Sequence, residues 1–256
     1  IMGRVDKKIA IVTGGGNGIG RAIAERLAVE GAIVTVTDQN PEAGKAVADG
    51  VDTMQFLEHD VRIAADWAKV MASVTRQHGR LDLLINNAGI LATESSQDVE
   101  STSLDQWRTV NAVNSEGVFL GCQQGIEAMK ATGGSIVNLS SIAALMATPH
   151  LSAYGASKAA VRQLTKTVAV HCGRKGYRIR CNSVHPGVIQ TRMGDHVMAL
   201  GGGNVEQKWA ARIAAIPLGE AGTVDDVANC VLFLASNEAH HITGAELVVD
   251  GGMTIC

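Results

Sequence analysis

The chain has 256 residues, of which 46% are hydrophobic and 3% aromatic, and its net charge of −3 comes from 22 basic and 25 acidic residues. The charges are spread along the chain without a basic block, which argues against nucleic acid as a partner, and no apolar run is long enough to span a membrane. A chain of this length can bury a large core. With so few aromatic residues, that core must be aliphatic, as in helix-covered parallel sheets.

Hydrophobic periodicity predicts that strands and helices alternate along the whole chain. We expect strands at 8–13, 32–37, 53–58, 81–86, 134–139, 178–184 and 245–249. We expect helices at 18–30, 41–49, 64–78, 103–130, 152–175 and 223–236. This alternation predicts an α/β fold in which right-handed crossovers place helices on both faces of a parallel sheet. No linker or repeat divides the chain, so residues 1–256 are expected to form one domain.

The first predicted strand leads into a glycine-rich turn, Thr13–Gly20, in which the first helix begins. A strand, a glycine-rich turn and a helix form the start of a dinucleotide-binding unit. Gly14 permits the tight turn, Gly18 lets a pyrophosphate approach the backbone, and Gly20 lets helix and strand pack closely. The helix N-terminus offers free N–H groups and partial positive charge to the phosphates. The alternative, a flexible turn without a ligand, is disfavoured because the glycines fall where the strand ends.

The second predicted strand is followed by Asp38, eighteen residues after Gly20. A carboxylate at this point can accept hydrogen bonds from both hydroxyls of an adenosine ribose, and it would repel a 2′-phosphate. No Arg or Lys stands at 15–17 or 39–40 to neutralise such a phosphate. The alternative is a strand-end aspartate that caps the next helix. We expect NAD rather than NADP as the cofactor.

Tyr154 and Lys158 lie four residues apart in the predicted helix at 152–175. This spacing puts both side chains on one helix face, about 6 Å apart along the axis. A free tyrosine has a pKa of about 10, and a close positive charge lowers that pKa. The pair can therefore give a proton to a ketone oxygen, or take one from an alcohol, near neutral pH. The alternative is an amphipathic surface pair.

With these motifs together, residues 7–252 resemble the short-chain dehydrogenase/reductase family. The resemblance implies a three-layer Rossmann fold with a seven-stranded parallel sheet. It implies two further catalytic residues: Ser141, which donates to the substrate oxygen, and Asn114, which holds a water that links Lys158 to solvent. It also implies that Lys158 hydrogen-bonds the nicotinamide ribose. The alternatives are a strand-end cap for Ser141 and a buried helix asparagine with backbone partners for Asn114.

The same resemblance implies cofactor contacts along the carboxyl ends of the strands. Residues 60–61 are similar to the pair that contacts adenine, 87–89 to the motif beside the central sheet, and 186–191 to the segment beside the nicotinamide. The cofactor-binding residues expected are Gly14, Asn17, Gly18, Ile19, Gly20, Asp38, Asp60, Val61, Asn87, Ala88, Gly89, Tyr154, Lys158, Pro186, Gly187, Val188 and Thr191. No spacing of His or Cys suggests a metal site, so no metal is expected.

Within the family, the stretches 59–61, 121–126, 132–136 and 176–186 resemble bacterial 3β/17β-hydroxysteroid dehydrogenases, and secondary-alcohol dehydrogenases share some of them. This likeness implies NAD-dependent interconversion of a secondary alcohol and a ketone, with a hydroxysteroid or a similarly bulky apolar substrate. A 3-oxoacyl-thioester reductase, a small cyclic alcohol or diol dehydrogenase, and an NAD-sensing regulatory protein are the alternatives. The thioester reductase would use NADPH and a basic patch, against which Asp38 and the acidic balance argue.

A longer segment at about 188–218 follows the sixth predicted strand, at the edge where ligands bind. We expect a substrate lid that pivots on Gly201, Gly202 and Gly203; the alternative is a surface helical hairpin. Apolar candidates for the substrate wall are Leu145, Met146, Val188, Met193, Val197, Met198 and Trp209. His150 and Gln190 are candidates for binding a distal polar group of the substrate.

The predicted helices at 103–130 and 152–175 and the segment 242–256 resemble the interfaces of family tetramers, so a homotetramer is expected. The five scattered cysteines are expected to be reduced thiols. The first strand begins at Lys8, which leaves no room for a signal peptide. These features together predict a cytoplasmic protein.

Overall fold

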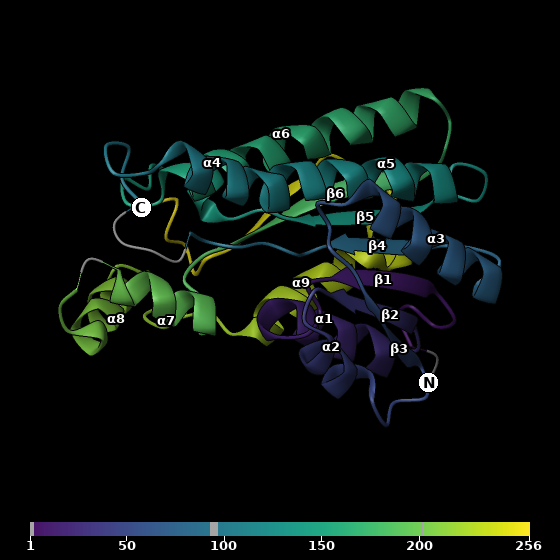
Figure 1. The fold of residues 1–256 in the computed structure, drawn as a ribbon, viewed down its shortest axis with the longest axis horizontal. Coiled ribbons are helices and arrows are strands. Elements are labelled where there is room, and N and C mark those ends of the chain that lie inside the picture. The colour runs from purple at the N-terminus through teal and green to yellow at the C-terminus, as the bar shows by residue number, and fades with distance from the viewer. Residues whose placement is uncertain (1–2, 93–96, 201) are drawn as a thin grey trace.

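A seven-stranded parallel sheet lies between two layers of helices in the computed structural model, which describes residues 3–92, 97–200 and 202–256 (Figure 1). The strand order is β3-β2-β1-β4-β5-β6-β7, which confirms the expected fold. The strands are β1 Ile9–Thr13, β2 Ile33–Asp38, β3 Met54–Glu58, β4 Leu83–Asn86, β5 Gly134–Leu139, β6 Ile179–Pro186 and β7 Glu246–Val249.

The helices form the two outer layers. They are α1 Gly18–Val29, α2 Pro41–Ala48, α3 Ala64–His78, α4 Leu104–Asn111, α5 Gly117–Met129, α6 Ser152–Arg174, α7 Arg192–Ala199, α8 Val205–Ala214 and α9 Val224–Ala235. α3, α5 and α6 cover one face of the sheet, and α1, α2 and α9 cover the other (Figure 1). No helix in the described part of the chain is long and apolar enough to cross a membrane.

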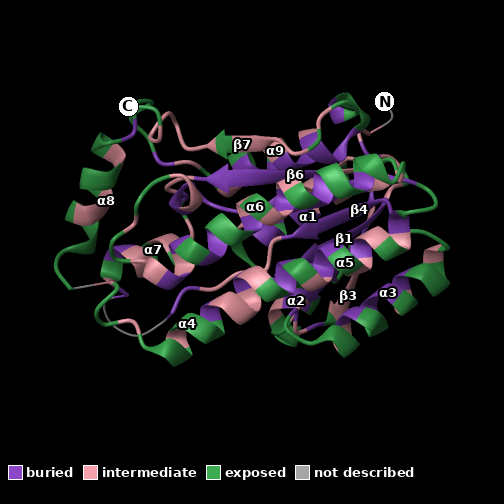
Figure 2. Ribbon diagram, turned by 90° about the horizontal axis from the view of Figure 1, so that it is seen from above, coloured by how far each residue is buried: buried purple, intermediate pink, exposed green. Residues whose placement is uncertain are grey.

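Successive side chains of the strands build two separate halves of the core. In β1, Ile9 and Ile11 pack with Trp67 beneath α3, α5 and α6, whereas Ala10 and Val12 pack beneath α1 and α9. Every residue of β1 is buried, and Figure 2 shows the inner strands enclosed while the outer faces of the helices are exposed. Because both faces of the sheet are covered, β1 is almost entirely apolar, and the polar residues of β5 and β6, such as Asn138 and Ser183, are buried with hydrogen-bond partners.

The strand order reverses beside β1, which pairs with β2 on one side and with β4 on the other. The chain therefore crosses from one half of the sheet to the other after β3. In open parallel sheets, ligands bind outside the carboxyl ends of the strands at such a reversal. The turn after β1 and the segments after β4, β5 and β6 all leave the sheet at this edge.

The predicted helix at 103–130 is divided into three parts. α4 and α5 are separated by one turn of π-helix, Ala112–Glu116, which contains Asn114. An inserted π-turn widens the helix locally and is frequent at functional sites. α5 then packs closely on β4 and α3, because a Cβ at Gly121 would overlap Asn86 Oδ1 of β4 and lie 2.8 Å from the Trp67 ring of α3.

The segment after β6 contains two helices, α7 and α8, which lie together beyond the carboxyl ends of the strands (Figure 1). The Trp209 side chain packs against Gly194, where a Cβ would be 3.2 Å from the indole, and its Nε1–H donates to Asp195 Oδ1 at 3.2 Å. Gly201 of the predicted pivot lies outside the described residues, whereas Gly202 and Gly203 have φ values of 71° and 88°. The two helices contact each other and form a helical hairpin.

Candidate active site

Tyr154 and Lys158 occupy the first two turns of α6, and the structure brings them beside the carboxyl end of β5. Lys158 is 4% exposed, and its Nζ lies 5.6 Å from the centre of the Tyr154 ring. The ammonium donates to the main-chain carbonyl of Leu139, the last residue of β5, at 2.8 Å. The helical spacing expected from the sequence is therefore present, and the pair faces inward rather than forming a surface pair.

Ser141 follows β5 by two residues and is 8% exposed. Its hydroxyl oxygen accepts a hydrogen bond from the Ala143 N–H at 3.2 Å and so caps a short 3₁₀ turn, Ile142–Ala144. The same hydroxyl lies close enough to the Tyr154 phenol to lower the pKa of that phenol. The strand-end cap is therefore present, and it fixes the hydroxyl near the phenol whose pKa it lowers.

Burial controls the charge state of both α6 groups. Burial raises the pKa of Tyr154 above its ordinary value, and hydrogen bonding to Ser141 partly offsets that rise. Burial lowers the pKa of Lys158 to about 8. The expectation that Lys158 lowers the pKa of Tyr154 is wrong for this structure, because desolvation dominates and the ammonium is bonded to Leu139 and not to the phenolic oxygen.

Asn114 is fully buried in the π-turn. Its amide donates to Ile90 O at 2.9 Å and to Ser157 Oγ at 3.0 Å, and its Oδ1 accepts from Ile90 N at 2.8 Å. Backbone partners for this asparagine, the alternative interpretation, are thus present. The Oδ1 atom retains a second acceptor position and lies near Gly89, where a Cβ would be 3.4 Å from Oδ1 and 3.3 Å from Lys158 Nζ.

The glycine-rich turn has the features that a diphosphate needs. Asn17 precedes α1 and makes no side-chain cap, and the first turn of α1 contains no acidic residue. Its N–H groups, those of Gly18, Ile19 and Gly20, therefore remain available to an anion. Gly18 has a φ of 51° with no heavy atom within 4 Å of a Cβ position. These residues fit the diphosphate of a dinucleotide.

Gly14 and Gly20 allow the close packing around this turn. Gly14 has a φ of 62°, and a Cβ there would lie 2.8 Å from Ala88 Cα. Asn87 ties the end of β4 to the turn, because its Nδ2 donates to Thr13 O at 2.9 Å and to Gly14 O at 3.0 Å. Thr13 Oγ1 also accepts from the N–H groups of Asn87 and Ala88, each at 3.1 Å. Residues 87–89 thus stand beside the turn as expected.

Asp38 lies at the end of β2 and faces the glycine-rich turn. Its Oδ2 accepts from Gly16 N at 3.0 Å, and its Oδ1 accepts from Asn40 N at 2.9 Å. The cap of α2 is Asn40, whose side chain accepts from the N–H groups of Glu42 and Ala43. The alternative in which Asp38 caps this helix is therefore wrong, and each of its oxygens retains acceptor capacity for a ribose hydroxyl.

Asp60 and Val61 follow β3. The Asp60 carboxylate is paired with Arg62, whose Nε lies 2.9 Å from Oδ1, and this hydrogen-bonded pair lowers the pKa of Asp60. Val61 is 7% exposed and packs against Gly117, where a Cβ would be 2.8 Å from Val61 Cγ2. The local charge of Asp60 is thus balanced within its own loop, and Val61 lies against the start of α5.

The segment after β6 is bonded to neighbouring strands and loops. Gly187, which follows Pro186, donates to Val249 O at 2.9 Å, and a Cβ at Gly187 would be 2.8 Å from Asp250 Cα. The Val188 carbonyl accepts from Gly222 N at 2.9 Å. Thr191 caps α7, because its hydroxyl oxygen accepts from Gly194 N at 3.0 Å.

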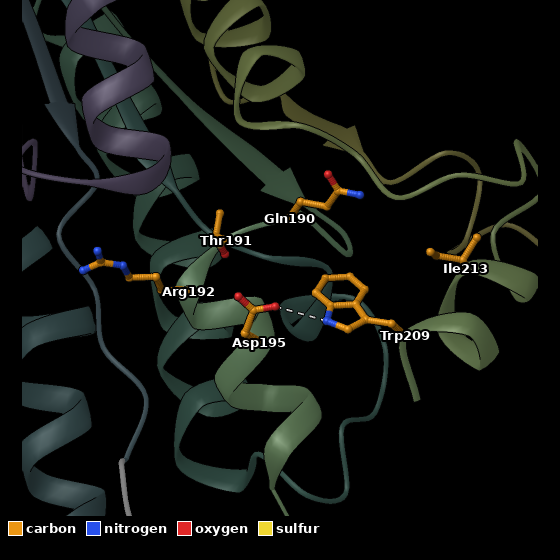
Figure 3. Close-up of a pocket in the computed structure, with 6 residues that line it drawn as sticks. All are labelled: Gln190, Thr191, Arg192, Asp195, Trp209 and Ile213. Carbon is orange, nitrogen blue, oxygen red and sulfur yellow. Dashed lines mark hydrogen bonds between the residues drawn. The ribbon is translucent and has the colours of Figure 1, made fainter. Parts of the chain in front are cut away.

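A cavity of about 520 Å³ lies between this segment and α8 (Figure 3). Its lining residues are Gln190, Thr191, Arg192, Asp195, Trp209 and Ile213. Asp195 and Trp209 face each other, whereas the Arg192 side chain points away from the indole (Figure 3). Gln190 and Trp209 were expected near the substrate; Arg192 and Asp195 were not, because a polar residue on a surface helix gives no signal of the cavity it lines.

His185 is a further residue near the site that the sequence gives no reason to place there. It is fully buried in β6, its Nδ1 lies 3.1 Å from the Ser141 carbonyl oxygen, and its Nε2 lies 2.8 Å from Ser183 Oγ. The two segments that meet here are 44 residues apart, so no local pattern reports the contact.

No group of three or more His, Cys, Asp or Glu side chains that could hold a metal is present among residues 3–92, 97–200 and 202–256.

Residues 14–254 match a family model described as enoyl-(acyl carrier protein) reductase. The chain is 40% identical over 256 residues to the NADP-dependent (R)-specific alcohol dehydrogenase of Lentilactobacillus kefiri, with 98% of each covered.

A second relative, the 3-beta-hydroxysteroid dehydrogenase of Comamonas testosteroni, is 40% identical over 252 residues, with 98% of this chain and 97% of the relative covered. The crystal structure of levodione reductase superposes with a TM-score of 0.91 at 32% identity, covering 97% of this chain and 98% of the other. The fold, the arrangement of the site and these matches agree. The protein belongs to the short-chain dehydrogenase/reductase family, whose members are oxidoreductases with a nicotinamide cofactor.

Proposed function

We propose that this protein is an NAD(H)-dependent enzyme that interconverts a secondary alcohol and a ketone on a bulky apolar substrate, a hydroxysteroid or a molecule of similar size. The observation that carries the proposal is the meeting of three groups at one edge of the sheet. The Ser141 hydroxyl lies close enough to the Tyr154 phenol to lower its pKa, and the buried Lys158 ammonium lies beside the same ring. This set can bind and protonate a carbonyl oxygen.

The bound nicotinamide would supply or accept the hydride, and the protein groups would handle the oxygen and its proton. Tyr154 is the proposed acid and base. Its raised pKa keeps the phenol protonated at neutral pH, which is the form that donates to a ketone. Ser141 donates to the same oxygen and stabilises the charge that develops there. Lys158 holds the nicotinamide ribose, and Asn114 holds a water that returns a proton to the pair.

The cofactor proposal, NAD, rests on the charge around Asp38. The carboxylate lies at the turn, bonded to the Gly16 N–H, and the neighbouring positions 15–17 and 39–40 contain no Arg or Lys. A 2′-phosphate placed here would meet an uncompensated negative charge. The relative from L. kefiri is named NADP-dependent, so this charge is the feature that separates the two possibilities for this chain.

The substrate proposal rests on the cavity that the segment after β6 forms with α7 and α8. A volume of about 520 Å³ lies within the range of sites for drug-sized ligands. Its wall combines the Trp209 ring and Ile213 with the polar side chains of Gln190 and Asp195, which suits an apolar body with a polar end. We propose that residues 188–218 form a lid over it, with α7 and α8 as its rigid parts.

The experiment is a substrate panel. The protein is incubated with NAD or NADP and with steroid alcohols, cyclic alcohols or 3-hydroxyacyl thioesters, and the reduced nicotinamide is followed by its ultraviolet absorbance. We expect turnover of the bulky secondary alcohols with NAD. Turnover of the thioesters alone would favour a 3-oxoacyl-thioester reductase. Turnover of the small cyclic alcohols alone would favour a cyclic alcohol or diol dehydrogenase. NAD binding without turnover of any alcohol would favour the regulatory protein.

We further propose a homotetramer in the cytoplasm. Exposed apolar side chains stand on the helices expected at the interface: Trp107 on α4, Phe119 on α5 and Val170 on α6 are 40%, 52% and 53% exposed. All five cysteines are free thiols, which suits a reducing compartment. Light scattering after gel filtration tests the assembly, and a monomer would contradict it.

A further inference from the structure

The segment that presents Ser141 is held residue by residue. Lys158 Nζ donates to the carbonyl of Leu139 at 2.8 Å. Ser140 donates its N–H to Val184 O at 2.8 Å and its hydroxyl to Lys158 O at 2.9 Å. A further bond holds Ser141 itself, because its carbonyl oxygen lies 3.1 Å from His185 Nδ1. The strand ends here, so the Ser141 carbonyl is held by the Ala144 N–H at 3.0 Å and by His185, and not by pairing within the sheet.

His185 has a defined tautomer. The Ser141 carbonyl is only an acceptor, so Nδ1 must carry the proton and donate to it. Nε2 is then an acceptor for the Ser183 hydroxyl at 2.8 Å. Burial lowers the pKa of His185 below its ordinary value, although the bond to Ser141 opposes this effect. Both ring nitrogens of the neutral imidazole are therefore satisfied, and the ring is held from both ends.

We propose that His185 is the positioning residue for Ser141: by donating to the Ser141 carbonyl, it fixes the direction in which the Ser141 hydroxyl points. His185 is fully buried and so touches neither substrate nor cofactor. The Ser141 backbone is extended, with φ of −169° and ψ of 161°. Rotation of this peptide would move the hydroxyl away from Tyr154. The inference rests on the proposed role of Ser141 in ketone reduction.

Two amide variants separate positioning from packing. In His185→Asn the amide nitrogen takes the place of Nδ1 and can still donate to Ser141. In His185→Gln the longer side chain puts its amide at the place of Nε2, next to Ser183. Both keep a buried polar side chain in β6, so their unfolding temperatures should be similar. We expect His185→Gln to lower kcat by about 10- to 100-fold, since a small misplacement has such effects, and His185→Asn to recover most of this loss.

For both His185 variants we would measure kcat, KM, the unfolding temperature and, by fluorescence, the Kd for NADH. The same measurements are then repeated with each His185 variant combined with Ser141→Ala. NADH affinity should stay within about twofold. In Ser141→Ala the added His185→Gln should cost no more than about twofold, because its effect passes through the missing hydroxyl. An equal loss in both backgrounds, or equal kcat for the two amide variants, would overturn the inference. Full turnover by Ser141→Ala alone would instead refute the proposed role of the serine.

Discussion

The Lys158 ammonium is bonded to the Leu139 carbonyl at 2.8 Å, so a cation of α6 closes the carboxyl end of β5 just before Ser141. This bond joins the two elements that supply the proposed catalytic groups. It also explains how a lysine that is 4% exposed keeps a polar partner. The Lys158 ammonium has further N–H donors, and its Nζ lies near Gly89, where the proposed cofactor and water sites meet.

The Tyr154 hydroxyl should be essential for turnover and dispensable for cofactor binding. Tyr154→Phe removes only the phenolic oxygen, whose pKa the Ser141 hydroxyl lowers, and loss of a general acid typically costs about 10²- to 10⁴-fold in rate. We expect kcat to fall by this factor while the Kd for NADH, measured by fluorescence, is unchanged. Lys158→Ala, the comparison variant, should weaken both. A Tyr154→Phe enzyme with near-normal kcat would refute the acid and base assignment.

Lys158 should reduce stability at neutral pH. Burial lowers its pKa to about 8 from an ordinary 10.5, so the unfolded chain binds this proton more tightly than the folded protein does. The resulting penalty on the folded state is complete below pH of about 8 and disappears as the pH rises toward 10.5. Lys158→Met should therefore raise the free energy of unfolding by about 1–3 kcal/mol near neutral pH.

Urea unfolding of wild type and Lys158→Met at several pH values measures this difference. The gain should shrink above pH of about 8, where the wild-type ammonium deprotonates in the folded state. Loss of the bond to Leu139 works in the opposite direction by about 1 kcal/mol at every pH. A difference that is independent of pH would show that the lysine is not desolvated in the folded protein.

Asp38 should decide between NAD and NADP. Asp38→Asn keeps the size of the side chain and one oxygen acceptor for Gly16 or Asn40, and it removes the charge that repels a 2′-phosphate. We expect the ratio of kcat/KM for NAD to that for NADP to fall by at least about tenfold, which corresponds to about 1.4 kcal/mol. Steady-state kinetics with both cofactors measures it. A wild-type preference for NADP would contradict the NAD proposal directly.

Trp209 should control recognition of large substrates. Trp209→Leu removes the ring that lines the cavity and its bond to Asp195, so KM for a bulky alcohol should rise by about tenfold, with less effect on a small ring. Asp195→Asn keeps an oxygen that accepts from the indole and serves as the control. An equal rise in KM for large and small substrates would contradict this selectivity, and an unchanged KM for the bulky alcohol would place Trp209 outside the substrate site.

Two helical glycines should respond oppositely to alanine. A Cβ at Gly121 would lie 2.8 Å from the Trp67 ring, whereas a Cβ at Gly173 has no heavy atom within 4 Å. Gly121→Ala should destabilise the protein by about 1–3 kcal/mol through overpacking. Gly173→Ala should stabilise it by about 0.5–1 kcal/mol, because alanine is the better helix former. Urea unfolding of both variants tests the packing of α5 on α3 and β4. A Gly121→Ala variant as stable as the wild type would contradict this packing.

The sequence by itself determined the order of the strands and of the helices that cover the sheet, because each of these elements has a local periodicity that burial on a sheet imposes. The bounds of α7 and α8, which lie beyond the sheet, were not predicted. The turn after β1 and the spacing of Tyr154 and Lys158 were predictable for the same reason: glycine positions and a four-residue repeat are local properties. The family resemblance added Ser141 and Asn114. Local patterns did not reveal the π-turn that divides 103–130, since helical periodicity continues on both sides of it.

Only the tertiary structure decided which groups meet and how strongly they are desolvated. The contact of His185 with Ser141 and the bond of Lys158 to Leu139 join residues from different elements. The direction of the Tyr154 pKa was predicted wrongly from spacing alone, because burial, which depends on the whole packed site, outweighs the nearby charge. Spacing along the chain sets which side chains share a helix face, whereas the packing of several elements sets their environment.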